Sequence, residues 1–315
     1  MRPIRLGVSA CLLGEEVRYD AGHKRDSFLC ETLGRFVEWV PVCPEVDIGL
    51  GVPREPIRLI AGSSGTRLVA TRSGTDLTDT MPRYGRRKVK DLAAADLCGY
   101  VLKKDSPSCG MERVKVHAGT GPSVRSGVGL FAQALQEAFP SLPIEEEGRL
   151  NDSALRENFI ERVFAYRRWR DFLADKTTLG ALVEYHADHK LLLMAHSPAH
   201  YTRLGRIVAG GKSMTKARLH ETYGAQLMDA LAIPATARKN ANVLYHVLGY
   251  FKKVLTAAEK QEMIETIQSY STGLVPLIVP ITLLSHYVRK YDQPYLARQV
   301  YLSPHPRELM LRNHV

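Results

Sequence analysis

The sequence predicts an α/β N-terminal domain with a largely parallel sheet, followed by an all-α helical domain. Three observations predict this division. Short apolar runs alternate with helical patterns in the first half, as in parallel sheets. From Asn151 onwards only helical periodicity recurs. The chain has 315 residues, about twice the length of an ordinary domain of ~150 residues. We therefore place the domains at residues 1–150 and 151–315.

Four apolar runs in the first domain have the length of β-strands. They are residues 4–9, 39–42, 100–103 and 143–147. Residues 57–60 and 68–71, on either side of a Gly-Ser-Ser-Gly turn, predict a β-hairpin. Helices are predicted at residues 28–36, 80–97 and 129–139, and Gly99 is expected to end the second of them. Because strands and helices alternate, the sheet should be largely parallel.

A polar junction at residues 148–153 separates the domains and supplies good helix N-caps. The helices that follow are predicted at residues 154–173, 179–195, 201–208, 215–231, 238–255, 257–270 and 280–291. Glycines and prolines punctuate them, at Gly210-Gly211 and at Pro234 for example. The second domain shows no β pattern and no repeat of fixed period.

The chain is expected to be cytoplasmic and not associated with a membrane. Its first residues lack the apolar run of a secretory signal. The most apolar segment, residues 272–285, is shorter than the ~18 residues of a membrane span and contains two prolines. Five cysteines, an odd number, in such a chain favour metal binding or catalysis over a disulfide framework.

Three of the cysteines, Cys11, Cys43 and Cys109, each follow an apolar strand. Sites in open α/β sheets form beyond the carboxyl ends of the strands, so these residues can converge there. The spacing C-x31-C-x65-C is no local metal motif. On spacing alone they are either ligands of a metal or cluster or small buried side chains. For Cys30 and Cys98 we expect plain burial.

The residues around the three cysteines narrow the choice. They form the blocks SACLLG, VCPE and KKDSPSCG, in this order. Thiolates bind iron–sulfur clusters, and a four-iron cube with three ligands leaves one iron open as a Lewis acid. Glu45 stands two residues after Cys43, where it suits proton transfer, although it could also cap a helix or pair with Arg54. Ser106 could position water or merely hold a turn.

Taken together, these blocks resemble the thiouracil desulfidase (TudS-like) family over residues 1–150. The resemblance implies a [4Fe-4S] cluster on Cys11, Cys43 and Cys109, whose free iron takes the thiocarbonyl sulfur of a thiolated pyrimidine. It also implies that Glu45 is the acid/base residue and Ser106 the catalytic serine. The sequence departs from the family pattern at none of these five positions.

The second domain carries a weaker resemblance of its own. Its block YHADHKLLLMAHSPAHY, residues 185–201, and the basic helices after it are similar to the YbgA-like domain that is fused to this family. The fused architecture resembles the tRNA 4-thiouridine desulfidases (RudS-like). The resemblance therefore implies thiolated tRNA as the substrate.

The distribution of charge also favours a polyanionic partner. The net charge is +10, with 21 basic and 19 acidic residues in 1–150 but 22 and 14 in 151–315. Residues 186–253 alone have ten basic and three acidic residues, a net charge of +7, and six histidines. Nucleic acid is the first candidate, and a solvated basic face is the alternative. The candidate RNA-binding residues are Lys190, Arg203, Arg206, Lys212, Lys252 and Lys253.

Several other features leave two interpretations open. Tyr201, Tyr245, Tyr250 and Phe251 are interleaved with the charge and could stack on bases or face the core. Four histidines, at 186, 189, 196 and 200, have helical spacings that would suit zinc, but packing, capping or RNA contact is favoured. The basic run at residues 83–88 is either a solvated helix start or a phosphate contact at the mouth of a cleft.

The sequence thus predicts a [4Fe-4S]-dependent desulfidase that converts 4-thiouridine in tRNA to uridine by hydrolysis without net redox. One alternative is a desulfidase of free thiouracil. Another is an iron–sulfur sensor that binds nucleic acid and catalyses nothing. Position 4 of the pyrimidine is favoured over position 2 by the resemblance alone, and no obligate protein partner is expected.

Overall fold

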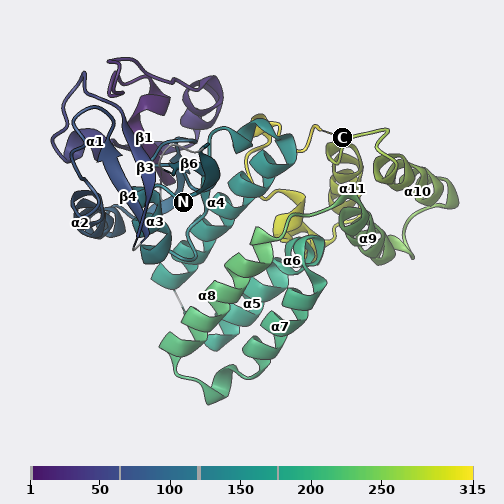
Figure 1. The fold of residues 1–315 in the computed structure, drawn as a ribbon. Helices are drawn as coiled ribbons and strands as arrows, with labels where there is room; N and C mark the ends of the chain where they lie inside the picture. The colour runs from purple at the N-terminus through teal and green to yellow at the C-terminus, as the bar shows by residue number, and fades with distance from the viewer. Residues whose placement is uncertain (1–2, 64, 119–121, 176, 315) are drawn as a thin grey trace. The chain divides into compact units, whose positions relative to one another are not determined.

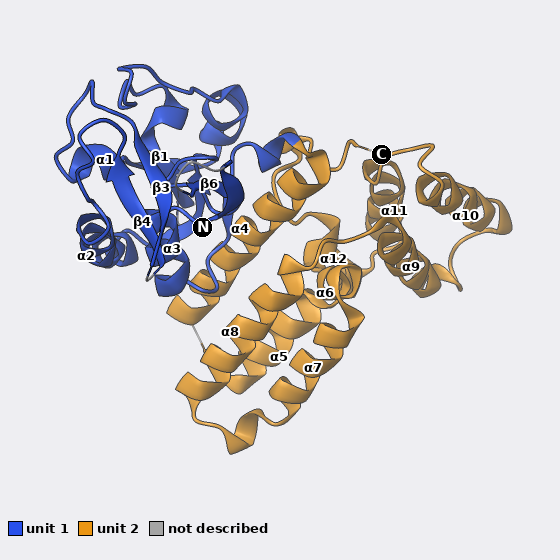
Figure 2. Cartoon of the chain, in the orientation of Figure 1, with its two compact units in different colours: residues 1–151 blue, residues 152–315 orange. Residues whose placement is uncertain are grey.

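The structure, a computed structural model, describes residues 3–63, 65–118, 122–175 and 177–315 (Figure 1). The chain divides into two compact units, residues 1–151 and 152–315 (Figure 2). The first unit contains two β-sheets with helices. The described residues of the second unit form helices and no strand. The predicted fold class, an α/β part followed by an all-α part, is confirmed.

Sheet A of the first unit is parallel throughout. Its strands lie in the order β2-β1-β5-β8. They are β1 (Arg5–Ser9), β2 (Glu38–Val42), β5 (Leu97–Leu102) and β8 (Ile144–Glu146). Ser9 pairs with Val42, and Leu102 pairs with Glu146. The carboxyl ends of the strands therefore lie along one edge of the sheet, which is where the chain turns into the cysteine-containing segments.

A second, mixed sheet completes the unit. Sheet B has the order β4-β3-β6-β7. Its strands are β3 (Ile57–Gly62), β4 (Gly65–Ala70), β6 (Val114–His117) and β7 (Val124–Gly127). The predicted hairpin is the antiparallel pair β3–β4. Strands β6 and β7 were not predicted, because VKVH and VRSG are four residues long and partly charged. Pairing of β6 with β3 and of β7 with β6 defines them.

The helices of the first unit differ from the prediction in two places. They are the short turns η1 (Ala10–Leu13), η2 (Phe28–Thr32), η3 (Leu33–Arg35) and η4 (Arg149–Asn151), and the helices α1 (Pro44–Asp47), α2 (Thr80–Ala94) and α3 (Leu130–Ala138). The predicted helix 28–36 is a π turn followed by a 3₁₀ turn. Helix α2 ends at Ala94, and Gly99 lies within β5 rather than ending a helix. The fully buried run LCGYVL is better accommodated in the sheet.

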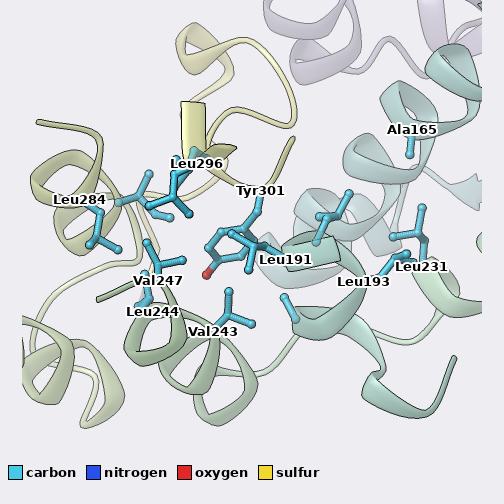
Figure 3. Close-up of a cluster of buried hydrophobic side chains, with 14 of the residues drawn as sticks. Ala165, Leu191, Leu193, Leu231, Val243, Leu244, Val247, Leu284, Leu296 and Tyr301 are labelled. Atoms are coloured by element: carbon cyan, nitrogen blue, oxygen red, sulfur yellow. The ribbon is translucent and has the colours of Figure 1, made fainter. Parts of the chain in front are cut away.

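The second unit is a set of helices around one apolar core. They are α4 (Ser153–Ala174), α5 (Leu179–Asp188), α6 (Lys190–His196), α7 (Pro198–Ala209), α8 (Lys216–Ala232), α9 (Ala237–Leu248), α10 (Ala257–Ser271), α11 (Ile278–Lys290) and α12 (Pro294–Ala297), with 3₁₀ turns η5 (Gly211–Ser213), η6 (Gly249–Phe251), η7 (Val300–Leu302) and η8 (Arg307–Leu309). The helix predicted at 179–195 is divided at His189 into α5 and α6. Figure 3 shows part of the core, where Leu191, Val243 and Leu284 surround Tyr301.

None of the described helices combines the length and the apolar composition that crossing a bilayer requires.

Candidate active site

A cavity of about 290 Å³ lies at the carboxyl edge of sheet A. The segments that follow β1, β2 and β5 line it. Cys11, Cys43 and Cys109 contribute to its wall together with Glu45 and Ser106. The structure therefore brings together all five residues that the sequence singled out in this unit, although they come from three separate segments.

The three thiols suit a cluster better than a single ion. Cys11 lies on η1, Cys43 directly precedes α1, and Cys109 follows β5; all three are free of disulfides. Within the described residues, no three His, Cys, Asp or Glu side chains converge as ligands of one metal ion. In an iron–sulfur cube each protein ligand binds a different iron, so the thiols need to surround a cavity rather than meet at a point. This donor set fits that arrangement.

The remaining two cysteines lie outside the cavity wall. Cys98 is fully buried in β5, and Cys30 is half-buried with its Sγ 3.7 Å from the Leu12 carbonyl oxygen. Burial was predicted for both side chains, but only Cys98 is completely buried.

Burial keeps the three cavity thiols protonated when nothing is bound. It raises the pKa of Cys11 to about 11 against the opposing charge of Lys103. It raises the pKa of Cys109 to about 12, and the nearby Glu45 carboxylate adds to this. The pKa of Cys43 is also raised by burial. Because metals bind thiolates, loading a cluster here must release protons.

The Glu45 carboxylate is held on both oxygens. Glu45 lies on α1, directly after the Pro44 that starts this helix. Its Oε2 accepts hydrogen bonds from Arg54 Nη2 at 2.7 Å and Nε at 3.1 Å. Arg54 is itself almost buried and also donates to the Val17 and Gly51 carbonyls. The pairing of Glu45 with Arg54 that the sequence left open is therefore present, and it forms part of the cavity wall.

Two serines form a chain of hydrogen bonds that begins at the other carboxylate oxygen of Glu45. Ser108 Oγ lies 2.7 Å from Glu45 Oε1 and 2.9 Å from Ser106 Oγ. A carboxylate oxygen accepts, so Ser108 donates to Glu45, and Ser106 is left to donate to Ser108. The Ser106 oxygen also accepts the backbone N–H of Cys109 at 3.1 Å. The result is a directed chain of hydrogen bonds from Ser106 through the buried Ser108 to Glu45.

Two glycines are required for the shape of the loop that carries Ser106 and Ser108, here called the serine loop. Helix α3 begins directly beneath the loop, where the N–H of Phe131 donates to the Ser108 carbonyl at 3.0 Å. A Cβ on Gly129 would lie 2.5 Å from the same carbonyl oxygen. A Cβ on Gly110 would lie 2.8 Å from the Ser106 carbonyl oxygen. Close packing of α3 against the loop therefore requires glycine at position 129, and the fold of the loop itself requires glycine at position 110.

Sequence reasoning missed part of the cavity wall. No catalytic role was predicted for Ser108, although the pair of serines two residues apart is a usable signal. Lys24 and Lys104 line the cavity, are exposed, and form no ion pair among the described residues. Lys103 is instead paired with Glu147, at 2.5 Å. Lys104 stands in the KKDSPSCG block with Cys109 and could have been found there, whereas no local spacing links Lys24 to the cysteines.

The candidate RNA-binding residues belong to the second unit and line no part of this cavity. Arg203 and Arg206 are exposed on α7, Lys212 is exposed on η5, and Lys252 and Lys253 are exposed after η6. Lys190, at the start of α6, is half-buried. All but Lys190 are thus available to solvent.

The aromatic residues and histidines of this unit are mostly structural. Phe251 is fully buried and cannot stack on a base, whereas Tyr245 and Tyr250 are exposed. His196 is buried between Glu161 and the Ile233 carbonyl, and His186 stacks on Tyr201. Within the described part of the chain, histidines form no group that could hold a metal. Packing therefore accounts for these two histidines.

Comparison with known proteins separates the two halves of the chain. Residues 6–147 match the family described as 2-thiouracil desulfurase. A solved structure titled [4Fe-4S]-dependent thiouracil desulfidase TudS is 32% identical, covers 49% of this chain and 97% of its own length, with a TM-score of 0.41. The chain belongs to the 2-thiouracil desulfurase family. The uncharacterized protein YbbK of Bacillus subtilis (strain 168) is 33% identical over 156 residues, 97% of its length and 46% of this chain.

The second half matches a different family. Residues 190–306 match a family described as protein of unknown function (DUF1722). The uncharacterized protein YbgA of Escherichia coli (strain K12) is 33% identical over 165 residues, 98% of its length and 52% of this chain. The predicted resemblance, a thiouracil desulfidase fused to a YbgA-like domain, is confirmed, and the protein is an enzyme of the 2-thiouracil desulfurase family.

Proposed function

We propose that the protein is a [4Fe-4S]-dependent desulfidase that converts 4-thiouridine in tRNA to uridine. The observation that carries this proposal is the single cavity lined by Cys11, Cys43, Cys109 and Glu45. The three cysteines would hold the cluster. When bound, it offers an iron without a protein ligand as a Lewis acid for the thiocarbonyl sulfur.

The reaction is a hydrolysis. The oxygen of water forms a bond to the ring carbon, the carbon–sulfur bond breaks, and sulfur leaves as hydrosulfide, so no electrons are transferred. Glu45 accepts the proton of the attacking water, either directly or through Ser108. General base catalysis of this kind typically contributes ~10²–10⁴ in rate. Arg54 holds the carboxylate in position at the cavity wall through its two hydrogen bonds.

Ser106 supports this chemistry from the far end of the hydrogen-bond chain. Its hydroxyl donates to Ser108, which donates to Glu45. A proton can therefore pass from Ser106 through Ser108 to Glu45. A water molecule next to Ser106 would supply it, which is the role proposed for the catalytic serine.

The charge of the second unit supports tRNA over a free base as the substrate. Its exposed cations, Arg203, Arg206, Lys212, Lys252 and Lys253, suit a chain of phosphates. A free pyrimidine offers them nothing to bind. A modified base stacked within tRNA would have to leave the stack to enter the cavity, as bases do in other nucleic-acid enzymes.

The test supplies the anaerobically reconstituted protein with 4-thiouridine-containing tRNA and, separately, with free 4-thiouracil and 2-thiouracil. We expect sulfur release as hydrosulfide from the tRNA, at a kcat/KM well above that for either free base. Turnover of free bases alone would assign the protein to free thiouracil. Tight RNA binding without turnover of any substrate would assign it to a sensor.

Matched variants test the site itself. Cys11→Ala should lose the cluster absorbance and the activity, whereas Cys30→Ala, outside the cavity wall, should retain both. Glu45→Gln should retain the cluster absorbance but lose at least about 100-fold in kcat, in line with general base catalysis. Full activity of Glu45→Gln would show that another group accepts the proton.

A further inference from the structure

A second site-sized hollow lies elsewhere on the first unit. It is a groove of about 820 Å³ between α2 and α3, which lie side by side (Figure 1). Helix α2 lines it with four cations, Arg83, Arg86, Arg87 and Lys90. None of them lines the cysteine cavity.

Arg86, Arg87 and Lys90 follow Arg83 by three, four and seven residues, so the four cations share one face of α2. All four are exposed. Among the described residues none of them forms an ion pair; Arg87 instead lies over the Tyr84 ring, 6.0 Å from its centre. Like charges at these spacings destabilise a helix. The helix therefore carries an uncompensated row of charge that a bound polyanion would relieve.

The opposite wall of the groove does little to neutralise this charge. Helix α3 contributes Gln133 and Glu137. Glu137 is the one carboxylate that lines the groove among the described residues, and its Oε1 accepts a hydrogen bond from Gln133 Nε2 at 2.9 Å. Four positive charges thus face one negative charge, although residues 1–150 as a whole are nearly neutral.

Contacts between α2 and the short helix α1 connect the groove with the cavity wall. On another side of α2, Lys88 Nζ lies 3.4 Å from Asp47 Oδ2, and the Tyr84 hydroxyl donates to the same oxygen. Asp47 ends α1, the helix that carries Glu45, and its N–H donates to the Cys43 carbonyl at 2.9 Å. Groove and cavity thus belong to one compact unit, and α2 contacts the helix that carries Glu45.

We propose that the α2–α3 groove binds the phosphate backbone of the RNA next to the nucleotide held in the cavity. This rests on the proposed function and assigns part of substrate recognition to the catalytic unit itself. Three of the four cations are arginines, whose planar guanidinium groups bind phosphate oxygens in pairs. A row about 10 Å long, from Arg83 to Lys90, suits successive phosphates of a chain better than one small anion.

The test replaces all four cations by glutamine, which keeps helix propensity: R83Q/R86Q/R87Q/K90Q. The matched control removes four exposed cations of the same unit outside both hollows: R35Q/R58Q/R113Q/K115Q. We expect the groove variant to lose at least about tenfold in kcat/KM for thiolated tRNA, and its salt slope to fall by ~0.7–0.9 for each lost contact. Turnover of free 4-thiouracil and the cluster absorbance should not change.

Other outcomes overturn the proposal. They are unchanged turnover of tRNA, an equal loss in the control variant, or an equal loss with free 4-thiouracil. Selective loss of binding to vesicles of anionic lipid, with RNA unaffected, would assign the groove to a membrane surface instead. Binding of unmodified tRNA, measured by filter retention, tests the groove even if the wild-type protein proves to have no desulfidase activity.

Discussion

Ser108 connects the two side chains that the family resemblance implicates in catalysis. It is fully buried and donates to Glu45, while Ser106 donates to it. Ser108→Ala should interrupt this chain and reduce kcat by about 10- to 100-fold, less than the loss expected for Glu45→Gln. Sulfur release from thiolated tRNA measures the effect, and the cluster absorbance should stay intact.

The exposed Ser126 provides the control, since Ser126→Ala should leave kcat unchanged. A cluster lost together with activity in Ser108→Ala would instead mean that Ser108 mainly positions Cys109, whose Sγ lies 3.6 Å from its hydroxyl.

At this scale, the sequence predicts those residues that stand beside a strand end. Cys11, Cys43 and Cys109 could be grouped because parallel strands end at one edge, and Glu45 and Ser106 because they share blocks with them. Arg54 and Lys24 reach the cavity from segments without such a marker. Their place follows from loop geometry, which no local pattern specifies.

At the scale of elements, the start of helix α3 determines where the backbone of the serine loop can lie. A Cβ on Gly129 would stand 2.5 Å from the Ser108 carbonyl and 2.8 Å from the Cys109 nitrogen. Gly129→Ala should therefore push the loop away, destabilise the first unit by about 1–3 kcal/mol and reduce cluster content. Urea unfolding and the cluster absorbance measure the two effects.

Gly22→Ala is the matched control, because its nearest contact would be the exposed Asp20 side chain at 3.3 Å. Full cluster content and unchanged stability in Gly129→Ala would show that α3 can shift without disturbing the loop.

Element boundaries were predicted well where a hydrophobic period decided them and poorly where tertiary packing did. Helix α4, predicted at residues 154–173, follows its helical pattern closely. The end of α2 does not, because Leu97 and Cys98 gain more from burial in sheet A than from extending a helix. The break at His189 likewise has no Gly or Pro signal; its ring is buried, with Nδ1 bonded to the Tyr185 carbonyl.

A buried charge network joins the C-terminal segment to α4. Glu161 receives hydrogen bonds from His196 at 2.8 Å and from Arg312 at 3.1 Å. Burial alone would raise the pKa of Glu161, but the His196 hydrogen bond and the charges of His196, Arg312 and His305 lower it from 4.5 to about 2. A carboxyl group with a depressed folded-state pKa stabilises the fold fully above its ordinary pKa. This stabilisation is lost as the pH falls from about 4.5 towards 2.

Glu161→Gln should therefore destabilise the second unit at pH 7 by about 3–5 kcal/mol, the cost of leaving buried partners unpaired. It should also flatten the decline in stability below pH 4.5. Urea unfolding in a Trp39→Phe background lets Trp169 report on this unit. Glu308→Gln, at an exposed position, should change neither quantity. An equally steep acid decline in both variants would place the responsible carboxylates elsewhere.

At the scale of the whole molecule, the cavity and the exposed cations of residues 186–253 belong to different units. The cavity holds the chemistry in the first unit, and the exposed cations of α7 and η5 lie in the second. If these cations bind phosphates, R203Q/R206Q/K212Q should weaken tRNA binding without changing turnover of free 4-thiouracil. The salt slope of tRNA binding should fall by ~0.7–0.9 for each contact that is lost.

The control variant K260Q/R289Q/R307Q removes the same charge from exposed positions outside residues 186–253. An equal loss of tRNA binding in this control would mean that the net charge, and not the position of the cations, determines binding. Combining R203Q/R206Q/K212Q with the α2 variant separates the two surfaces further. Contacts with different phosphates should give additive losses in binding free energy, because distant and independent sites add. Losses that fail to add would mean that both sets of cations depend on one shared stretch of RNA.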